Sequence, residues 1–158
     1  MYKTLLTLFI AIIIFAGCSK SGNTPTPKST SLIVGKWYLA SDSDTMYTNN
    51  VRNYIFIDNN ILPGTYRSFN ADGSGVDYTP AHDNEAAYSV NVPYTISGDQ
   101  LSFNYPEEDI DGDHFDPRTD VYTIINLTKT NLGIKYIDAG TDSKGQHVVM
   151  TQYYYYTR

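Results

Sequence analysis

The feature of this sequence that most constrains its fold is a hydrophobic period of two residues. From Tyr88 to Ile96, apolar side chains occupy every second position. Such alternation is typical of a strand with one face in a core and the other in solvent. No stretch carries an i, i+3, i+4 apolar stripe long enough for a major helix. The sequence therefore predicts an all-β domain, with Pro93 at a sheet edge or a bulge because proline cannot donate a ladder hydrogen bond.

Turn residues separate further strands with the same pattern. The Ser97-Gly98-Asp99 turn leads into a partner strand, and Lys129-Thr130-Asn131 joins strands 121–127 and 132–136 into a hairpin. Other strands are expected at 35–40, 51–57, 65–69, 75–79, 100–104 and 147–157. Short strands at even spacing indicate either a β-sandwich or an up-and-down antiparallel barrel.

The N-terminal segment, residues 1–17, is interpreted as a signal peptide. Lys3 provides a positive start, and the apolar run of residues 5–16 is too short to cross a bilayer as a helix. The ending Phe15-Ala16-Gly17-Cys18 resembles a bacterial lipobox, in which the cysteine is acylated, for example with palmitate, and becomes the first mature residue. This resemblance implies a membrane-anchored envelope lipoprotein, and Ser19 after the cysteine favours the outer membrane.

Residues 18–31 are expected to form a flexible tether between the lipid anchor and a single domain at 32–158. After Cys18 the tether has no aromatic or aliphatic side chain, so it cannot bury enough surface to offset its ordering entropy. Removal of Lys3 with the signal changes the formal net charge from -6 to -7. An acidic domain repels phosphate backbones, which argues against nucleic acid as a partner. Cys18 is the only cysteine, so no internal disulfide is expected.

Four motifs in this order resemble the small lipocalin-like domains of bacterial envelope lipoproteins. They are G-x-W at 35–37, F-x-x-D-G-x-G at 69–75, Y-x-I-x-G-D-x-L at 94–101 and the strand pair from Tyr122 to Leu132. The resemblance implies an all-β, lipocalin-like, antiparallel up-and-down barrel of about eight strands. It also implies that Trp37 plugs the closed end of the barrel. Arg158 is the candidate for the basic residue that packs over this tryptophan.

Fifteen tyrosines, four of them consecutive at 153–156, are the main clue to function. Inward tyrosines would make a lining that is apolar and yet able to form hydrogen bonds. Tyrosine is also a good strand former, so the same side chains could simply fill the core. The candidate residues for binding a small hydrophobic or amphipathic ligand are Trp37, Tyr54, Tyr94, Tyr136 and Tyr154. The alternative is a filled barrel that docks on an envelope protein assembly as a non-catalytic interaction protein.

The acidic segment 107–116 offers the one candidate metal site. Asp109, Asp111 and Asp113 resemble the start of a calcium loop, which uses oxygen ligands at alternate positions. The glycine position does not fit an EF-hand, so a generic Ca²⁺ loop and a solvated acidic loop both remain open. None of the three histidines lies at metal-ligand spacing from another, and no nucleophile–base pair is visible. The sequence therefore predicts a protein that is not an enzyme and has no cofactor other than this possible calcium ion.

Overall fold

The computed structural model describes residues 30–158, except residues 84, 111 and 112. Within this part, a single four-residue helix, α1 (Thr30–Ile33), precedes the strands. No helix of the described part is long and apolar enough to cross a membrane. The strands are β1 (Gly35–Thr48), β2 (Val51–Asp58), β3 (Tyr66–Phe69), β4 (Gly75–Thr79), β5 (Tyr88–Asn91), β6 (Tyr94–Ser97), β7 (Gln100–Tyr105), β8 (Glu108–Ile110), β9 (Asp113–Phe115), β10 (Arg118–Leu127), β11 (Asn131–Thr141) and β12 (His147–Thr157).

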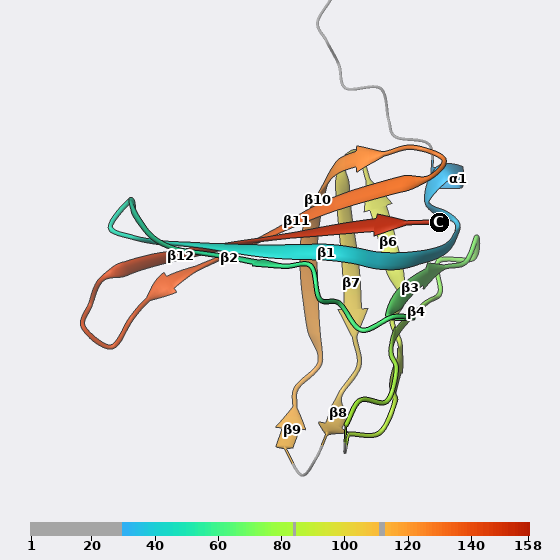
Figure 1. Cartoon of the computed structure of the whole chain (residues 1–158), viewed down its shortest axis with the longest axis horizontal. Helices are drawn as coiled ribbons and strands as arrows, with labels where there is room; N and C mark the ends of the chain where they lie inside the picture. Colours follow the sequence, from blue (N-terminus) through green and yellow to red (C-terminus); the bar gives the residue numbers. More distant parts are fainter. Residues whose placement is uncertain (1–29, 84, 111–112) are drawn as a thin grey trace, which may run out of the picture.

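The main sheet is antiparallel and returns on itself to form a barrel (Figure 1). Its strand order is β5-β4-β3-β1-β12-β11-β10-β7-β6, with β2 beside β1. The two end strands, β5 and β6, are consecutive in the chain. At their join, the Val92 N–H donates to the Gly75 carbonyl of β4, and the Asn104 N–H of β7 donates to the Pro93 carbonyl, both at 2.9 Å. The antiparallel all-β barrel that the sequence predicts is confirmed, and Pro93 lies at a break between strands.

The described sheet has ten strands, more than the eight or so predicted. One reason is that the predicted strand 88–96 is divided at Val92 and Pro93 into β5 and β6. A second reason is β2, which pairs with the outer part of β1 rather than entering the barrel between β1 and β3. The short β8–β9 hairpin forms a separate two-stranded sheet inside the predicted acidic loop.

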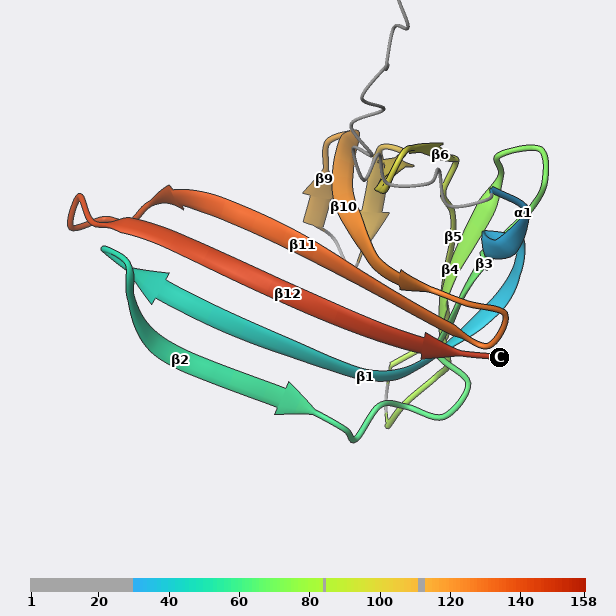
Figure 2. The same cartoon turned by 90° about the horizontal axis from the view of Figure 1, so that it is seen from above.

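Four strands extend beyond the barrel as a flat arm (Figures 1 and 2). β3 pairs with β1 only as far as Tyr38, and β10 pairs with β11 only as far as Tyr136. Beyond these points β1 and β11 continue, and β12 lies between them over its whole length. The arm therefore consists of β2 and the outer parts of β1, β12 and β11. The prediction that the first strand ends at residue 40 is wrong, because β12 and β2 hold the polar segment after it in a ladder from both sides.

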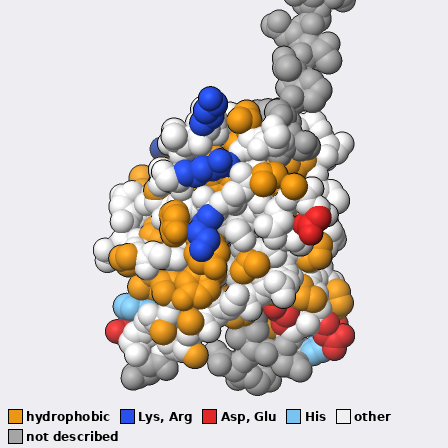
Figure 3. All heavy atoms as spheres, turned by 90° about the vertical axis from the view of Figure 1, so that its right-hand side faces the viewer, with side chains coloured by type: hydrophobic (Ala, Val, Ile, Leu, Met, Phe, Trp, Pro, Cys, Tyr) orange, Lys and Arg blue, Asp and Glu red, His pale blue; other side chains and the backbone are white. Residues whose placement is uncertain are grey.

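The hydrophobic core of the described residues lies inside the barrel, and the arm has no core of its own. The core joins inward side chains from most barrel strands: Ile33, Trp37, Phe69, Val90, Val92, Tyr94, Leu101, Phe103, Tyr105, Tyr122, Ile124, Leu132, Ile134 and Tyr156. Figure 3 shows the face of the molecule turned away from the arm, where basic side chains lie among hydrophobic ones. The Lys36 ammonium lies 3.7 Å from the ring centroid of Tyr66. α1 includes Thr30 and Ser31, which the sequence analysis assigns to the tether.

Candidate functional site

A cavity of about 180 Å³ lies where β1 leaves β3 and begins to pair with β2. A register shift between Leu39 and Ser41 marks this change of partner. The lining combines one ion pair with a group of tyrosines and a few smaller side chains: Leu39, Thr65, Tyr66, Arg67, Asp77, Tyr78, Thr79, Tyr88, Tyr154 and Tyr156. The site is therefore largely aromatic, with a charged pair in its wall.

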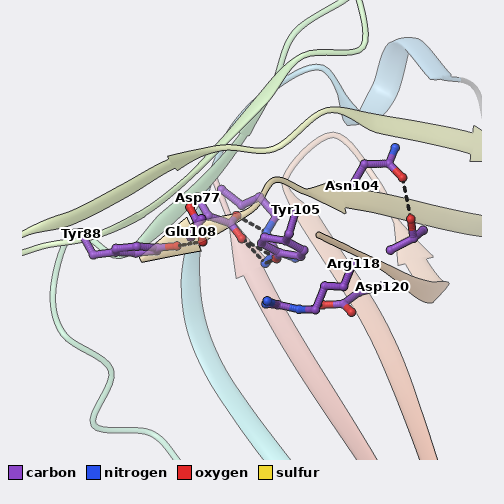
Figure 4. Close-up of polar contacts among 9 residues, drawn as sticks. Asp77, Tyr88, Asn104, Tyr105, Glu108, Arg118 and Asp120 are labelled. Atoms are coloured by element: carbon purple, nitrogen blue, oxygen red, sulfur yellow. Dashed lines mark hydrogen bonds and ion pairs between the residues drawn. The ribbon is translucent and has the colours of Figure 1, made fainter. Parts of the chain in front are cut away.

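Arg67 and Asp77 form the charged pair, and the β-hairpin itself brings them together. They are direct cross-strand partners on β3 and β4, and their side chains are only 12% and 17% exposed. The Arg67 guanidinium donates to the Asp77 carboxylate through Nε and through Nη2, the latter at 2.5 Å. The Tyr105 hydroxyl donates to Asp77 Oδ2 at 2.8 Å and accepts from Arg67 Nη2 at 3.1 Å (Figure 4). Both carboxylate oxygens of Asp77 are thus occupied, and the pair is held rigidly.

The remaining donor of Arg67 has no such partner. Its Nη1 atom is buried and makes no hydrogen bond of normal geometry to a described protein group. The Tyr122 hydroxyl nevertheless interacts with the Arg67 side chain: burial raises the pKa of Tyr122, and this contact with Arg67 lowers it. The guanidinium plane also lies against aromatic rings, 4.2 Å from the centroid of Phe103 and 5.6 Å from that of Tyr122. An unsatisfied buried donor costs about 1–3 kcal/mol. A hydrogen bond from Nη1 to a bound acceptor would therefore contribute more binding free energy than the same hydrogen bond at the surface.

The cavity lining is rich in hydrogen-bond donors, because its guanidinium and its buried tyrosine hydroxyls keep their protons. Burial by itself lowers the pKa of Arg67, but Tyr156, Asp77 and Tyr105 raise it well above its usual value, so the guanidinium stays charged. Burial is the main cause that raises the pKa of Tyr156, to about 12, and it also raises the pKa values of Tyr105 and Tyr154. These phenols are therefore protonated at neutral pH.

The rim of the site carries a second layer of polar contacts (Figure 4). The Tyr88 hydroxyl donates to Glu108 Oε2 at 2.8 Å, and burial together with this carboxylate raises the pKa of Tyr88 to about 12. On the other side of Tyr105, the guanidinium of Arg118 lies 4.4 Å from the ring centroid, and its Nε is 3.5 Å from an Asp120 oxygen. These contacts connect the β8–β9 region to the barrel and hold the aromatic wall in place.

The structure distributes the five predicted ligand-binding residues over the whole molecule. Tyr154 lines the cavity, and Tyr136 packs beside it through Tyr122, whose ring lies 5.1 Å from that of Tyr136. Trp37 is fully buried near the start of β1, and its Nε1–H donates to the Ile33 carbonyl of α1. Tyr94 is buried too, and its hydroxyl donates to the Asn70 carbonyl at 2.6 Å. Tyr54 lies on β2 in the arm and is 48% exposed.

Sequence reasoning missed Arg67 and Asp77, although a signal for both was present. The Asp72-Gly73 turn sets the register of the β3–β4 hairpin, in which Phe69 faces Gly75. Two residues further from the turn, the same register places Arg67 opposite Asp77. An oppositely charged pair at inward positions of a hairpin would have indicated a buried polar group inside the barrel.

Two more open hollows lie elsewhere on the described surface, without a buried charge. One of about 350 Å³ is beside α1, between Val34, Ala71 and Tyr94. The other, of about 280 Å³, lies on the arm, with Met46 and Met150 in its lining. The cavity at Arg67 is therefore the stronger candidate for a specific site.

The predicted anchor and one residue of the predicted calcium site lie outside the described residues. Cys18 and the signal peptide precede the described part, and Asp111 is not described. Asp109 and Asp113 belong to the short strands β8 and β9. The described residues hold no group of three or more His, Cys, Asp or Glu able to bind a metal ion. The calcium hypothesis stays a prediction.

Comparisons with known proteins find structural similarities without a matching family. No protein-family model matches the chain, and no curated protein matches it. A lipocalin-like protein from Bacteroides uniformis is similar at a TM-score of 0.46 and 12% identity, over 75% of this chain and 96% of that one. A protein from Bacteroides eggerthii is similar at 0.46 and 14%, over 80% and 99%. A bovine odorant-binding protein, a deswapped triple mutant, is similar at 0.39 and 16%, over 79% and 74%. The antiparallel barrel is shown by the strand order of the structure itself.

Proposed function

We propose that the barrel binds one small amphipathic ligand in the tyrosine-lined cavity, with a polar end of the ligand at Arg67. The observation that carries this proposal is Arg67, a residue that lines a cavity of about 180 Å³ and whose Nη1 atom is buried without a hydrogen bond to a described group. Asp77 neutralises the charge of Arg67, so a carbonyl, a hydroxyl or a carboxylate oxygen can each serve as the acceptor. The aromatic walls would contact the apolar part of the ligand.

The size of the cavity limits what the ligand can be. Typical small-molecule pockets have volumes of roughly 300–1,000 Å³. The cavity here is smaller than that range, so it suits either a small compound or the polar end of a longer one whose apolar part lies on the exposed arm. The role of the protein is then to hold and carry a molecule rather than to transform it.

Native mass spectrometry of the chain purified gently from its own host tests this proposal. We expect an additional small-molecule mass on the wild type, and its loss in Arg67→Gln. Arg52→Gln is the matched control, because it removes an exposed guanidinium from strand β2, which contributes no residue to the cavity lining. Tyr154→Phe, which leaves the ion pair intact, should weaken retention if the phenol contacts the ligand. The proposal would be contradicted if the wild-type chain carried no small molecule, or if wild type and Arg67→Gln retained the same amount of it.

We also propose that Cys18 anchors the protein in the outer membrane through acyl chains. The support is the lipobox resemblance and the polar tether at 18–31. Two or more acyl chains, at about 0.8 kcal/mol per buried methylene, hold a protein firmly in a bilayer. Cys18→Ala should therefore leave an unprocessed or soluble protein outside the membrane fraction. Continued fractionation of this variant with outer membranes at high salt would show that the anchor is not lipid at Cys18.

A second candidate function is a non-catalytic interaction protein that docks on an envelope protein assembly. The observation that favours it is the arm, which has no core of its own and carries most of its apolar side chains at the surface. Absence of any retained ligand, together with association of the intact chain with one envelope protein, would favour this second function over the first.

A further inference from the structure

Strand β2 is an edge strand whose outer backbone groups are free. Among the described strands it pairs only with β1, and Figure 2 shows it as the outermost strand of the arm. All its residues except Asp58 are exposed. Its central residues, Tyr54 to Ile57, are consecutive, uncharged and 45–61% exposed. Long apolar edges of this kind are templates for pairing with another strand.

We infer that β2 pairs antiparallel with β2 of a second copy of this chain, so that two arms join into one continuous sheet. A two-fold axis at Ile55 would place each Tyr54 opposite Phe56 of the second copy. Within one chain the rings of Tyr54 and Phe56 already lie parallel, 6.5 Å apart at 4°. Their stack would continue across the axis, and aromatic cross-strand pairs stabilise sheets by about 0.2–1 kcal/mol each. This inference is independent of the proposed ligand.

The charges of β2 favour a second copy in the antiparallel direction. Arg52 and Asp58 are its only charged residues, and each lies three positions from Ile55. Antiparallel pairing brings the Arg52 end of one strand to the Asp58 end of the other, whereas in-register parallel pairing brings like charges together. The strand is therefore complementary to itself.

Asp58 forms no ion pair with a described residue of its own chain. It lies directly opposite Asp42 of β1, so two carboxylates face each other. One oxygen of Asp42 is buried and has no hydrogen-bond partner among the described residues. Arg52 of a second copy would bring a positive charge to this end of the strand and offset the repulsion.

If β2 paired with a different edge of the second copy, the assembly would not stop at two copies. The outer part of β11, from Ile137 to Thr141, is the other uncovered edge of the arm. Pairing β2 with that edge is head-to-tail and would continue into open assemblies, whereas β2 with β2 stops at a dimer. The outer part of β11 also has a single large apolar side chain, Ile137, so it offers little to the aromatic pair.

Disulfide trapping in intact membranes tests the inference on the full chain. Ile55→Cys would place two thiols across the two-fold axis, at a separation that a disulfide can span. Ile137→Cys is the matched control, because Ile137 is 51% exposed and Ile55 is 49% exposed on the same arm. Two copies with different epitope tags, expressed together, show whether the product contains two copies of this chain. The unmodified chain controls for Cys18.

We expect Ile55→Cys to give a homodimer under oxidation, several-fold more than Ile137→Cys or the unmodified chain. Arg52→Asp or Asp58→Arg in the Ile55→Cys background should lower the yield several-fold, and the combined exchange should restore it. A restored yield cannot result from misfolding of the single variants. Equal trapping at both positions, a product with another protein, a ladder of larger species, or no recovery in the combined exchange would each overturn the inference.

Discussion

The guanidinium of Arg158 lies 3.8 Å from the ring centroid of Trp37, so the last residue of the chain covers the single tryptophan at the start of the barrel. The same guanidinium donates from Nη2 to the carbonyls of Leu32 at 2.6 Å and Val34 at 3.0 Å. The backbone at Gly35 favours glycine, because its φ is +133°, and a Cβ there would just touch Arg158 Cζ at 3.4 Å. The packing of Arg158 over Trp37 that the sequence analysis expects is confirmed.

Trp37→Ala should destabilise the domain by roughly 3–5 kcal/mol, as for other large buried aromatic side chains. The side chain is fully buried, and its Nε1–H donates to the Ile33 carbonyl at 2.6 Å. The substitution thus leaves both a cavity and an unpaired carbonyl. Urea unfolding followed by far-UV circular dichroism measures the change. A loss below about 1 kcal/mol would show that Trp37 does not hold the barrel end.

Arg158→Gln should cost about 1 kcal/mol, because a cation–π contact near solvent contributes about 0.5–1 kcal/mol. Since the chain has one tryptophan, its fluorescence reports on this contact directly. We expect a shifted emission spectrum in Arg158→Gln. Lys144→Gln, in the β11–β12 turn, should change neither the spectrum nor the stability. Identical spectra of wild type and Arg158→Gln would contradict the contact.

Arg67→Met should destabilise the protein by roughly 3–5 kcal/mol, because it leaves the buried carboxylate of Asp77 without its cation. Replacing both partners, as Arg67→Met with Asp77→Leu, should recover most of the loss, since no buried charge then remains. Denaturant unfolding of the two single variants and the double variant gives the coupling. Additive losses would mean that the two side chains do not act as a pair.

Stability should fall as the pH rises from about 10 toward 12. Burial raises the pKa of Tyr156, and burial with Glu108 raises that of Tyr88, from the ordinary 10.0 to about 12. The unfolded chain therefore loses these protons first, so the stabilisation is complete below pH 10 and is lost as the pH approaches the folded values. Tyr156→Phe should reduce the fall. Tyrosinate absorbance in which every phenol titrates at its ordinary pKa would disprove this.

Asp42→Asn should stabilise the protein at neutral pH. Burial, followed by Asp58 and Asp44, raises the pKa of Asp42 above its ordinary 3.8. A raised carboxyl pKa favours folding at low pH, and this contribution is lost as the pH rises through the folded pKa. The gain from Asp42→Asn should therefore be present at pH 7 and shrink on acidification below the folded pKa. Melting temperatures of both proteins across this range provide the measurement, and a gain independent of pH would exclude the electrostatic cause.

The sequence by itself determined the barrel strands and the key residue of the barrel end. A period of two and well-placed Gly, Asn and Asp turns are local signals, so strands such as β4 and β12 begin and end where the pattern predicts. Trp37 is the same kind of case, because the motif that holds it lies within a few residues of chain.

Only the tertiary structure decided the arm and the cavity. The middle of β1, residues 41–44, reads Ser-Asp-Ser-Asp, which disfavours a strand on propensity, yet β12 and β2 pair with this part of the chain. The cavity needs Tyr154 from the end of the chain beside Arg67 from near its middle. Local patterns do not report which distant strands become neighbours, because strand pairing satisfies backbone groups of any sequence and burial of the side chains follows from it.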